Sequence, residues 1–264
     1  MIPFFLESNP GNRFCVYHPP KGTCRGSVLF VAPFAEELNK SRRMVSMQSS
    51  ALANKGYAVL AMDLYGCGDS SGDFREARWA IWMEDLELAS KWLNEKHGMP
   101  IMLWGLRFGA LVGMEFARIS GEKFGRVLLW QPVLSGEAFV SQFLRLRVTS
   151  EMLSGGKTSV QELKGELFSN GSIEIAGYDL PADIAENMGR LKLEDLALPG
   201  VMHQWLEISA SGELSPASHR VLAHWKSEEI PCEASSVQGE PFWATQEITE
   251  CRALIEETAR LFSN

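Results

Sequence analysis

The chain has 264 residues, of which 45% are hydrophobic and 22% are charged, and its formal net charge is −8. This length suits one α/β domain with an insertion. The acidic balance excludes nucleic-acid binding through a generally basic surface, and no apolar run reaches the roughly 20 residues of a membrane-spanning helix.

The cysteines, the first residues and the glycine spacing indicate the cellular compartment and the cofactors to expect. The five cysteines form no Cys-x-x-Cys pair and no Cys/His cluster at metal-ligand spacing. The first residues lack the basic region and the cleavage site of a signal peptide. Gly105, Gly109 and Gly113 are spaced by four, unlike a dinucleotide-binding motif. We expect a reduced, cytoplasmic protein that uses no metal and no other cofactor.

Apolar runs predict the strands of the first half. Residues 2–6 and 13–18 flank a turn signal and predict an opening hairpin at a sheet edge. Continuous apolar runs predict strands buried on both faces, at residues 27–32, 57–62, 101–104, 127–130 and 205–209. Helical spacing predicts the intervening helices, at residues 41–54 (capped by Asn39 or Ser41), 77–96 and 108–119. This alternation predicts a mostly parallel sheet with right-handed crossovers.

The alternation stops after Pro132 and resumes near residue 201. Between them we predict amphipathic helices and one short strand, at residues 139–152, 159–167, 182–188 and, for the strand, 172–178. The later elements are predicted as helix 215–226, strand 232–237 and a closing helix 245–262. We interpret residues 133–200 as a lid inserted over the carboxyl edge of the sheet, and residues 1–132 and 201–264 as the core domain.

A Gly-x-Arg-x-Gly frame, with Arg107 between Gly105 and Gly109, joins a predicted strand to a predicted helix. It resembles the nucleophile elbow of α/β-hydrolases, which has serine at the middle position. Residues 63–72 carry an Asp-x-x-Gly-x-Gly-x-Ser pattern that also resembles this superfamily. The resemblance covers nearly the whole chain. It implies the α/β-hydrolase fold, a mostly parallel sheet with helices on both faces and an inserted helical lid.

Residues 33–44, 104–110 and 239–248 resemble one subfamily more narrowly. It is the exosortase A system-associated hydrolase 2 group, found with bacterial exopolysaccharide and protein-sorting genes. The resemblance implies a role in such a system. The hydrolase label of that group rests on its fold and therefore implies a superfamily, not a reaction.

The three triad positions depart from the hydrolase pattern. Arg107 has no lone pair with which to attack a carbonyl. Glu213 is the carboxylate nearest to the usual position of the acid, after predicted strand 205–209. No histidine follows His224, and the loop expected to hold the base contains Trp243 instead. Without an imidazole there, the usual proton transfer has no agent. The sequence therefore predicts a non-classical hydrolase or a pseudoenzyme.

Arg107 itself admits two interpretations. It is either a structural arginine held in an ion pair or an anion-binding group at a helix N-terminus. In this fold the loop that carries Glu36 and Glu37 faces the elbow, so we hypothesise a bidentate pair between one of them and Arg107. The candidate ligand-binding residues are Phe34, Glu36, Glu37, Arg107, Phe108 and Trp243.

Three functions remain open from the sequence. The first is a triad-less homologue that binds an acidic or carbonyl-bearing small molecule, or a partner protein, under the lid. The second is an active ester, amide or thioester hydrolase whose nucleophile is displaced to Cys67 or Ser70. The third is a scaffold subunit of an export or polysaccharide assembly.

Overall fold

One mixed sheet organises residues 1–262, the part of the chain that this computed structural model describes. Within those residues, eight strands pair in the order β1-β2-β4-β3-β5-β6-β9-β10. Their bounds are β1 (Ile2–Glu7), β2 (Asn12–His18), β3 (Gly26–Val31), β4 (Tyr57–Met62), β5 (Ile101–Leu106), β6 (Phe124–Trp130), β9 (Met202–Ile208) and β10 (Cys232–Val237).

The strand directions follow the prediction. The opening hairpin lies at one edge, where β1 pairs antiparallel with β2 and β2 pairs antiparallel with β4. From β4 to β10 all neighbouring strands are parallel, as expected for strands joined through helices. The carboxyl ends of the parallel strands therefore meet at one edge, where the loops that follow them gather.

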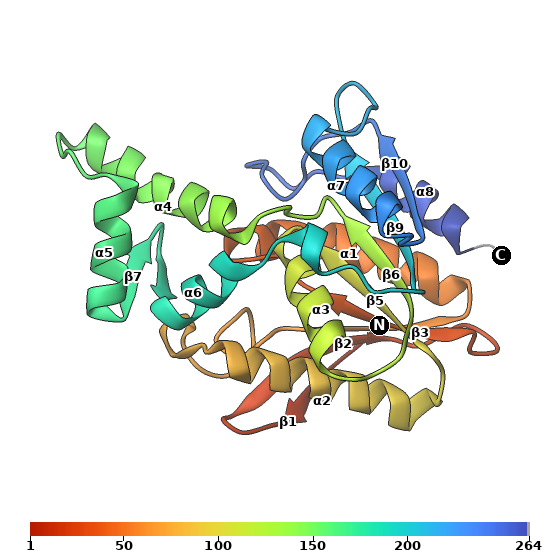
Figure 1. Cartoon of the computed structure of the whole chain (residues 1–264). Coiled ribbons are helices and arrows are strands. Elements are labelled where there is room, and N and C mark those ends of the chain that lie inside the picture. The colour runs from red at the N-terminus through yellow and green to blue at the C-terminus, as the bar shows by residue number, and fades with distance from the viewer. Residues whose placement is uncertain (263–264) are drawn as a thin grey trace.

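Helices cover both faces of the sheet (Figure 1). α1 (Glu36–Asn54) and α8 (Arg252–Leu261) contribute to the apolar cluster on one face. On the other face lie α2 (Trp79–His97), α3 (Phe108–Ile119) and α7 (Pro216–Ser227). This double cover buries β5 along its whole length. No helix in residues 1–262 is both long enough and apolar enough to cross a membrane.

The segment between β6 and β9 forms an arm beside the core. Figure 1 shows its first two helices reaching away from the sheet. As predicted, it carries three α-helices within the described residues, α4 (Gly136–Leu153), α5 (Val160–Asn170) and α6 (Ala182–Arg190). Two short 3-10 helices also occur, η1 (Phe74–Glu76) before α2 and η2 (Leu193–Asp195) after α6.

The prediction of one strand at residues 172–178 is wrong. The chain instead forms an antiparallel hairpin of β7 (Ser172–Ile175) and β8 (Tyr178–Pro181). Ala176 and Gly177 connect the two strands with φ angles of 52° and 86°. Two successive residues with positive φ make a tight two-residue turn, which reverses the chain within the predicted strand.

The predicted start of α1 is also wrong. The helix begins at Glu36, and its N-cap residue Ala35 (φ 51°) makes no side-chain cap. Glu36 and Glu37 lie in the first turn, where carboxylates interact favourably with the helix dipole. Ser41 does not cap the helix, because its hydroxyl donates to the Glu37 carbonyl inside it. This early start carries Glu37 to the carboxyl edge of the sheet.

The closing helix begins later than predicted, at Arg252 rather than at residue 245. The Thr245 hydroxyl contacts the carbonyls of Phe242 and Glu247 and so holds the preceding residues in a loop. Such local side-chain bonds compete with helix formation. The chain after β10 therefore has room for a loop that returns toward the elbow.

Candidate functional site

The turn between β5 and α3 has the strained geometry of an elbow. Arg107 has φ 55° and ψ −122°, a region that L-residues rarely occupy. A Cβ at Gly105 would lie 2.4 Å from the Ala110 Cα, and one at Gly109 would lie 2.3 Å from the Val31 carbonyl oxygen. Both positions therefore require glycine, as the frame in the sequence indicated.

The Arg107 side chain pairs with Glu37, as hypothesised from the sequence. Its Nε lies 3.2 and 3.3 Å from the two carboxylate oxygens, and its Nη2 lies 3.1 Å from Oε1. The two side chains are only 18% and 21% exposed. Burial raises the pKa of the Glu37 carboxyl, and the Arg107 guanidinium opposes part of that rise. The nearby Glu36 is exposed and accepts a hydrogen bond from the Tyr178 hydroxyl at 3.0 Å.

Trp243 completes this corner from the loop after β10. The guanidinium carbon of Arg107 lies 5.2 Å from the centre of the indole ring, within the range of a cation–π contact. Trp243 is 7% exposed and packs edge-on against Phe242. A carboxylate and an aromatic face therefore flank the cation at the position where the resemblance implies a serine and its base.

Aromatic rings fill the space beside the elbow and beneath the arm. The Phe34 ring contacts four others at centroid distances of 5.3 to 6.2 Å, those of Phe74, Phe108, Phe139 and Phe143. Phe108, the residue after Arg107, also stacks on Phe139 of α4 at 5.2 Å. Phe34 and Phe108 therefore lie together near the elbow, as expected. Their contacts are with other rings.

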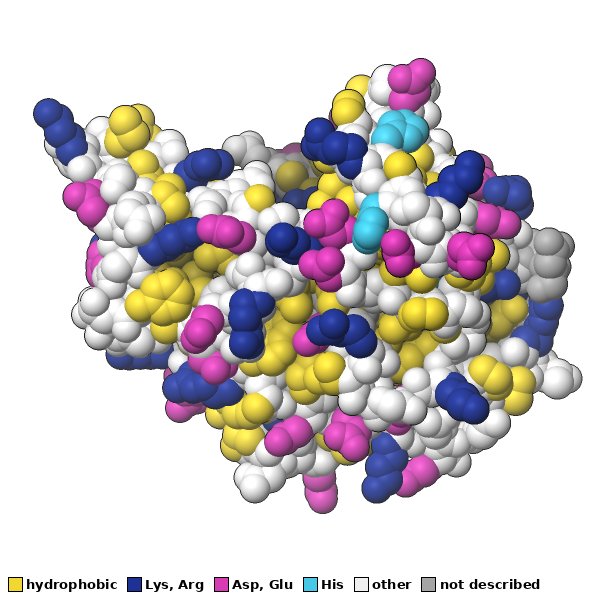
Figure 2. All heavy atoms as spheres, viewed as in Figure 1, with side chains coloured by type: hydrophobic (Ala, Val, Ile, Leu, Met, Phe, Trp, Pro, Cys, Tyr) yellow, Lys and Arg dark blue, Asp and Glu magenta, His cyan; other side chains and the backbone are white. Residues whose placement is uncertain are grey.

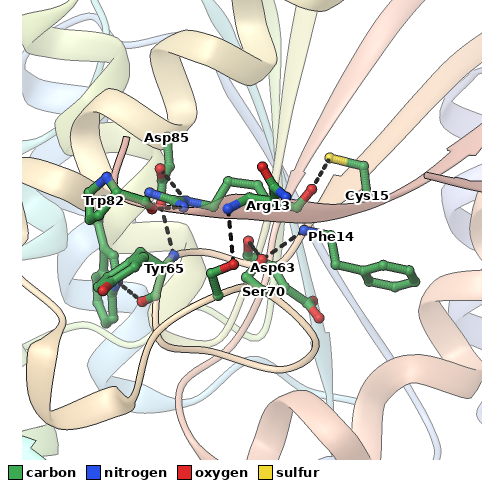
Figure 3. Close-up of polar contacts among 11 residues, drawn as sticks. Arg13, Phe14, Cys15, Asp63, Tyr65, Ser70, Trp82 and Asp85 are labelled. Carbon is green, nitrogen blue, oxygen red and sulfur yellow. Dashed lines mark hydrogen bonds and ion pairs between the residues drawn. The ribbon is translucent and has the colours of Figure 1, made fainter. Parts of the chain in front are cut away.

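Ser70, one candidate nucleophile, uses its hydroxyl in a structural role. The oxygen accepts from the Phe14 amide at 2.8 Å and donates to the Asp63 carbonyl at 2.5 Å (Figure 3). These bonds tie the loop after β4 to the edge strand β2. No hydrogen bond joins Ser70 to a histidine in the described part of the chain.

Cys67, the other candidate nucleophile, lies in the same loop. Burial raises the pKa of its thiol, and the Asp63 and Asp85 carboxylates raise it further. A thiol with a raised pKa holds its proton and is a poor nucleophile. Within residues 1–262, the bonds of the Ser70 hydroxyl and the raised pKa of the Cys67 thiol both argue against a displaced nucleophile.

The candidate acid, Glu213, is exposed, and we find no hydrogen bond or ion pair of its carboxylate within residues 1–262. A buried carboxylate that the sequence did not single out lies in β9. Glu207 is 4% exposed and accepts from the Trp205 indole at 2.8 Å, the Ser215 amide at 3.2 Å and the Ser218 hydroxyl. Glu207 was missed because it lies within an apolar run that was interpreted only as a buried strand. A carboxylate in such a run is unusual, and this was the signal that could have identified it.

A polar cavity lies between the start of α1, the loop after β4 and the β7–β8 turn. Its volume is about 540 Å³. The polar side chains that line it include Asn39, Arg42, Asp69, Asp73 and Tyr178. Arg42 is already paired with Asp63 at 2.7 Å. No group of three or more His, Cys, Asp or Glu residues within residues 1–262 could hold a metal ion.

Comparison with known families assigns the chain to a superfamily. The family model described as "Serine aminopeptidase, S33" matches residues 23–179, more than half of the chain. The chain belongs to this hydrolase family. Its fold is accordingly the predicted α/β-hydrolase fold, with a mostly parallel sheet flanked by helices. No curated protein matches this chain significantly.

Solved structures similar to this chain include the three that follow. Est1E from Butyrivibrio proteoclasticus with bound ferulic acid has a TM-score of 0.70 at 16% identity, over 98% of this chain and 97% of its own. A carboxyl esterase from Bacillus coagulans gives 0.67 at 16%, over 99% and 96%. An alpha-beta serine hydrolase homologue from Coxiella burnetii gives 0.59 at 14%, over 99% and 95%. Identities this low establish the fold alone.

Proposed function

We propose that this protein is an α/β-hydrolase homologue that works by binding and not by hydrolysis. The observation that carries the proposal is the pair between Arg107 and Glu37 at the elbow. A guanidinium cannot serve as the nucleophile, and the carboxylate and the Trp243 ring occupy its surroundings. The positive charge at the elbow is balanced by a neighbour from the same chain.

The ligand that we propose is carbonyl- or hydroxyl-bearing and occupies the polar cavity. An acidic ligand at Arg107 would have to displace Glu37, so the cavity is the better site. The Asn39 amide can donate to a carbonyl there, and Asp69 and Asp73 supply acceptors to hydroxyls. The Tyr178 hydroxyl already donates to Glu36, so only its oxygen remains as an acceptor. The proposal includes a role in a bacterial exopolysaccharide or exosortase system, which the sequence resemblance implies.

The test is a search for turnover with the purified chain. We expect hydrolysis of p-nitrophenyl acetate and butyrate at the rate of buffer alone, and no labelling by a fluorophosphonate probe. The Cys67→Ala and Ser70→Ala variants serve as controls for a displaced nucleophile, and circular dichroism verifies their folding. Turnover by the natural chain that disappears in Cys67→Ala would instead establish an active thiol hydrolase and end the proposal.

A second candidate, a scaffold subunit that binds a partner protein, is favoured by the arm. The rings beneath the arm fill the space next to the elbow, and its outer surface carries exposed hydrophobic side chains (Figure 2). They are Leu146, Met152, Leu153 and Phe168, exposed by 51%, 64%, 86% and 54%. The first three lie on α4 and Phe168 lies on the neighbouring α5. An exposed apolar patch often marks an interaction surface. Binding to a partner that Leu153→Asp abolishes, with the polar cavity unoccupied, would favour this candidate.

A further inference from the structure

A second cavity lies on the face of the sheet that α1 covers. Its volume is about 290 Å³. Its walls come from α1, β2, β3 and β4, and their apolar side chains include Phe14, Val16, Phe30, Leu38, Val45 and Ala61. The elbow rings Phe34 and Phe108 belong to the apolar cluster on the opposite face. This apolar cavity is therefore separate from the space beneath the arm.

The apolar and polar cavities share a wall. Leu38, Arg42 and Asp69 line both of them. Arg42 spans the boundary in an ion pair with Asp63, and its side chain remains 39% exposed. Phe14, Val16 and His18 line the apolar cavity along β2, whereas no β2 residue lines the polar cavity. The two cavities therefore extend in different directions from the shared wall at Arg42.

We infer that the two cavities form one site for a single-chain amphiphile, with its aliphatic tail along α1 and an uncharged, hydroxyl-bearing head in the polar cavity. This inference deepens the proposed binding function and rests on it. A pocket lined mainly by apolar groups, with a few polar groups at one end, is the usual form of a small-molecule site.

The dimensions set the length of the tail. An apolar cavity of about 150 Å³ holds benzene, so about twelve carbon atoms correspond to twice that volume. The α1 residues that line the apolar cavity run from Leu38 to Ser49, eleven residues apart. At 1.5 Å per residue the wall is about 16 Å long. A decyl chain meets both limits.

The charges of the polar cavity select the head. Asp69 and Asp73 line it, and the guanidinium of Arg42 is committed to Asp63 at 2.7 Å and lies 3.7 Å from Asp69. An anionic head would therefore meet two carboxylates and no free cation among these lining groups. Hydroxyls can donate to those carboxylates and accept from the Asn39 amide, which favours an uncharged polyol.

Decyl maltoside, below its critical micelle concentration, is the probe that tests this inference by calorimetric titration. We expect saturable binding, and binding of maltose alone and of decyl sulfate weaker by about tenfold or more. Ala61→Phe places a ring in the apolar cavity and should weaken decyl maltoside about tenfold or more. Val16→Phe provides a second cavity-filling variant, in case the first does not fold. Ala80→Phe, at an exposed position on α2, is the matched control and should bind normally.

Two results would overturn the inference. Undiminished binding by folded Ala61→Phe and Val16→Phe would show that the tail lies elsewhere. Equal affinity for decyl sulfate and decyl maltoside would remove the assignment of the head. Failure of the proposed function is separate, because it is detected as ester turnover, which these titrations do not measure.

Discussion

Replacing Glu37 with alanine would leave the Arg107 guanidinium in a corner with little access to water. The two side chains are 18% and 21% exposed and are joined by three contacts of 3.1 to 3.3 Å. The cation would keep the Trp243 ring but lose its carboxylate. The pair lies between two measured regimes, because exposed ion pairs contribute about 0–1 kcal/mol and breaking a buried pair costs about 3–5 kcal/mol.

From that burial we expect Glu37→Ala to lower the free energy of unfolding by about 2 kcal/mol at neutral pH. At about 2–4 °C per kcal/mol for a chain of this size, the midpoint of thermal unfolding falls by roughly 4–8 °C. The double variant Glu37→Ala/Arg107→Ala should be less destabilised than the sum of the single variants, with a coupling energy of about 1–2 kcal/mol. The reason is that the double variant leaves no unpaired charge.

Urea unfolding followed by circular dichroism measures all four corners of this cycle. Lys91 and Glu95 supply the control cycle, because their contact is 3.9 Å long and their side chains are 70% and 67% exposed. We expect their coupling energy to be below about 0.5 kcal/mol. If the Arg107–Glu37 coupling is as small as that of the control, the pair does not stabilise the elbow, and the structural basis of the proposed function fails.

Three further perturbations test the surrounding fold by the same unfolding measurement. Gly109→Ala should cost about 3 kcal/mol because its methyl group would meet the Val31 carbonyl, whereas Gly165→Ala, with open space around it, should not destabilise. Asp85→Ala should cost about 3–5 kcal/mol by stranding Arg13, since the two side chains are 1% and 0% exposed (Figure 3). Burial lowers the pKa of His203 to about 4 from 6.5, so the unfolded chain takes up its proton first, and stability should fall by up to about 3 kcal/mol as pH decreases from 6.5 to 4. In His203→Gln the free energy of unfolding should depend less on pH between 6.5 and 4. If the pH dependence is unchanged in this variant, His203 is not its source.

The central elements could be predicted because their signals are local. β4 and β10 have the predicted bounds, as does α3, which begins immediately after the elbow. An apolar run between turn residues contains the information for a buried strand. The starts of α1 and α8 could not be predicted in this way. They depend on a strained Ala35 and on hydroxyl bonds of Thr245, which no periodicity records.

Within the site, what could be predicted depended on knowing the fold. The sequence predicted that Arg107 pairs with a glutamate from the segment after β3, because that segment faces the elbow in the fold that the chain resembles. In the structure, Glu37 makes this contact. The position of the Trp243 ring and the packing of rings around Phe34 required coordinates, because these contacts join segments far apart in sequence. The catalytic and ligand roles of the candidate residues remain predictions.

The chain keeps the backbone geometry of the elbow because contacts of the backbone fix it, independently of the side chain at position 107. The Arg107 amide donates to the Trp130 carbonyl at 3.0 Å, and the Arg107 carbonyl accepts from Ala110 and Val133, each at 3.2 Å. Together with the close contacts at the two flanking glycines, these bonds impose the positive φ on any residue at this position. The Gly-x-x-x-Gly frame is therefore evidence for the packing of a strand against a helix. Evidence for chemistry must come from the middle residue and its neighbours, and here a cation, a carboxylate and an indole favour binding over turnover.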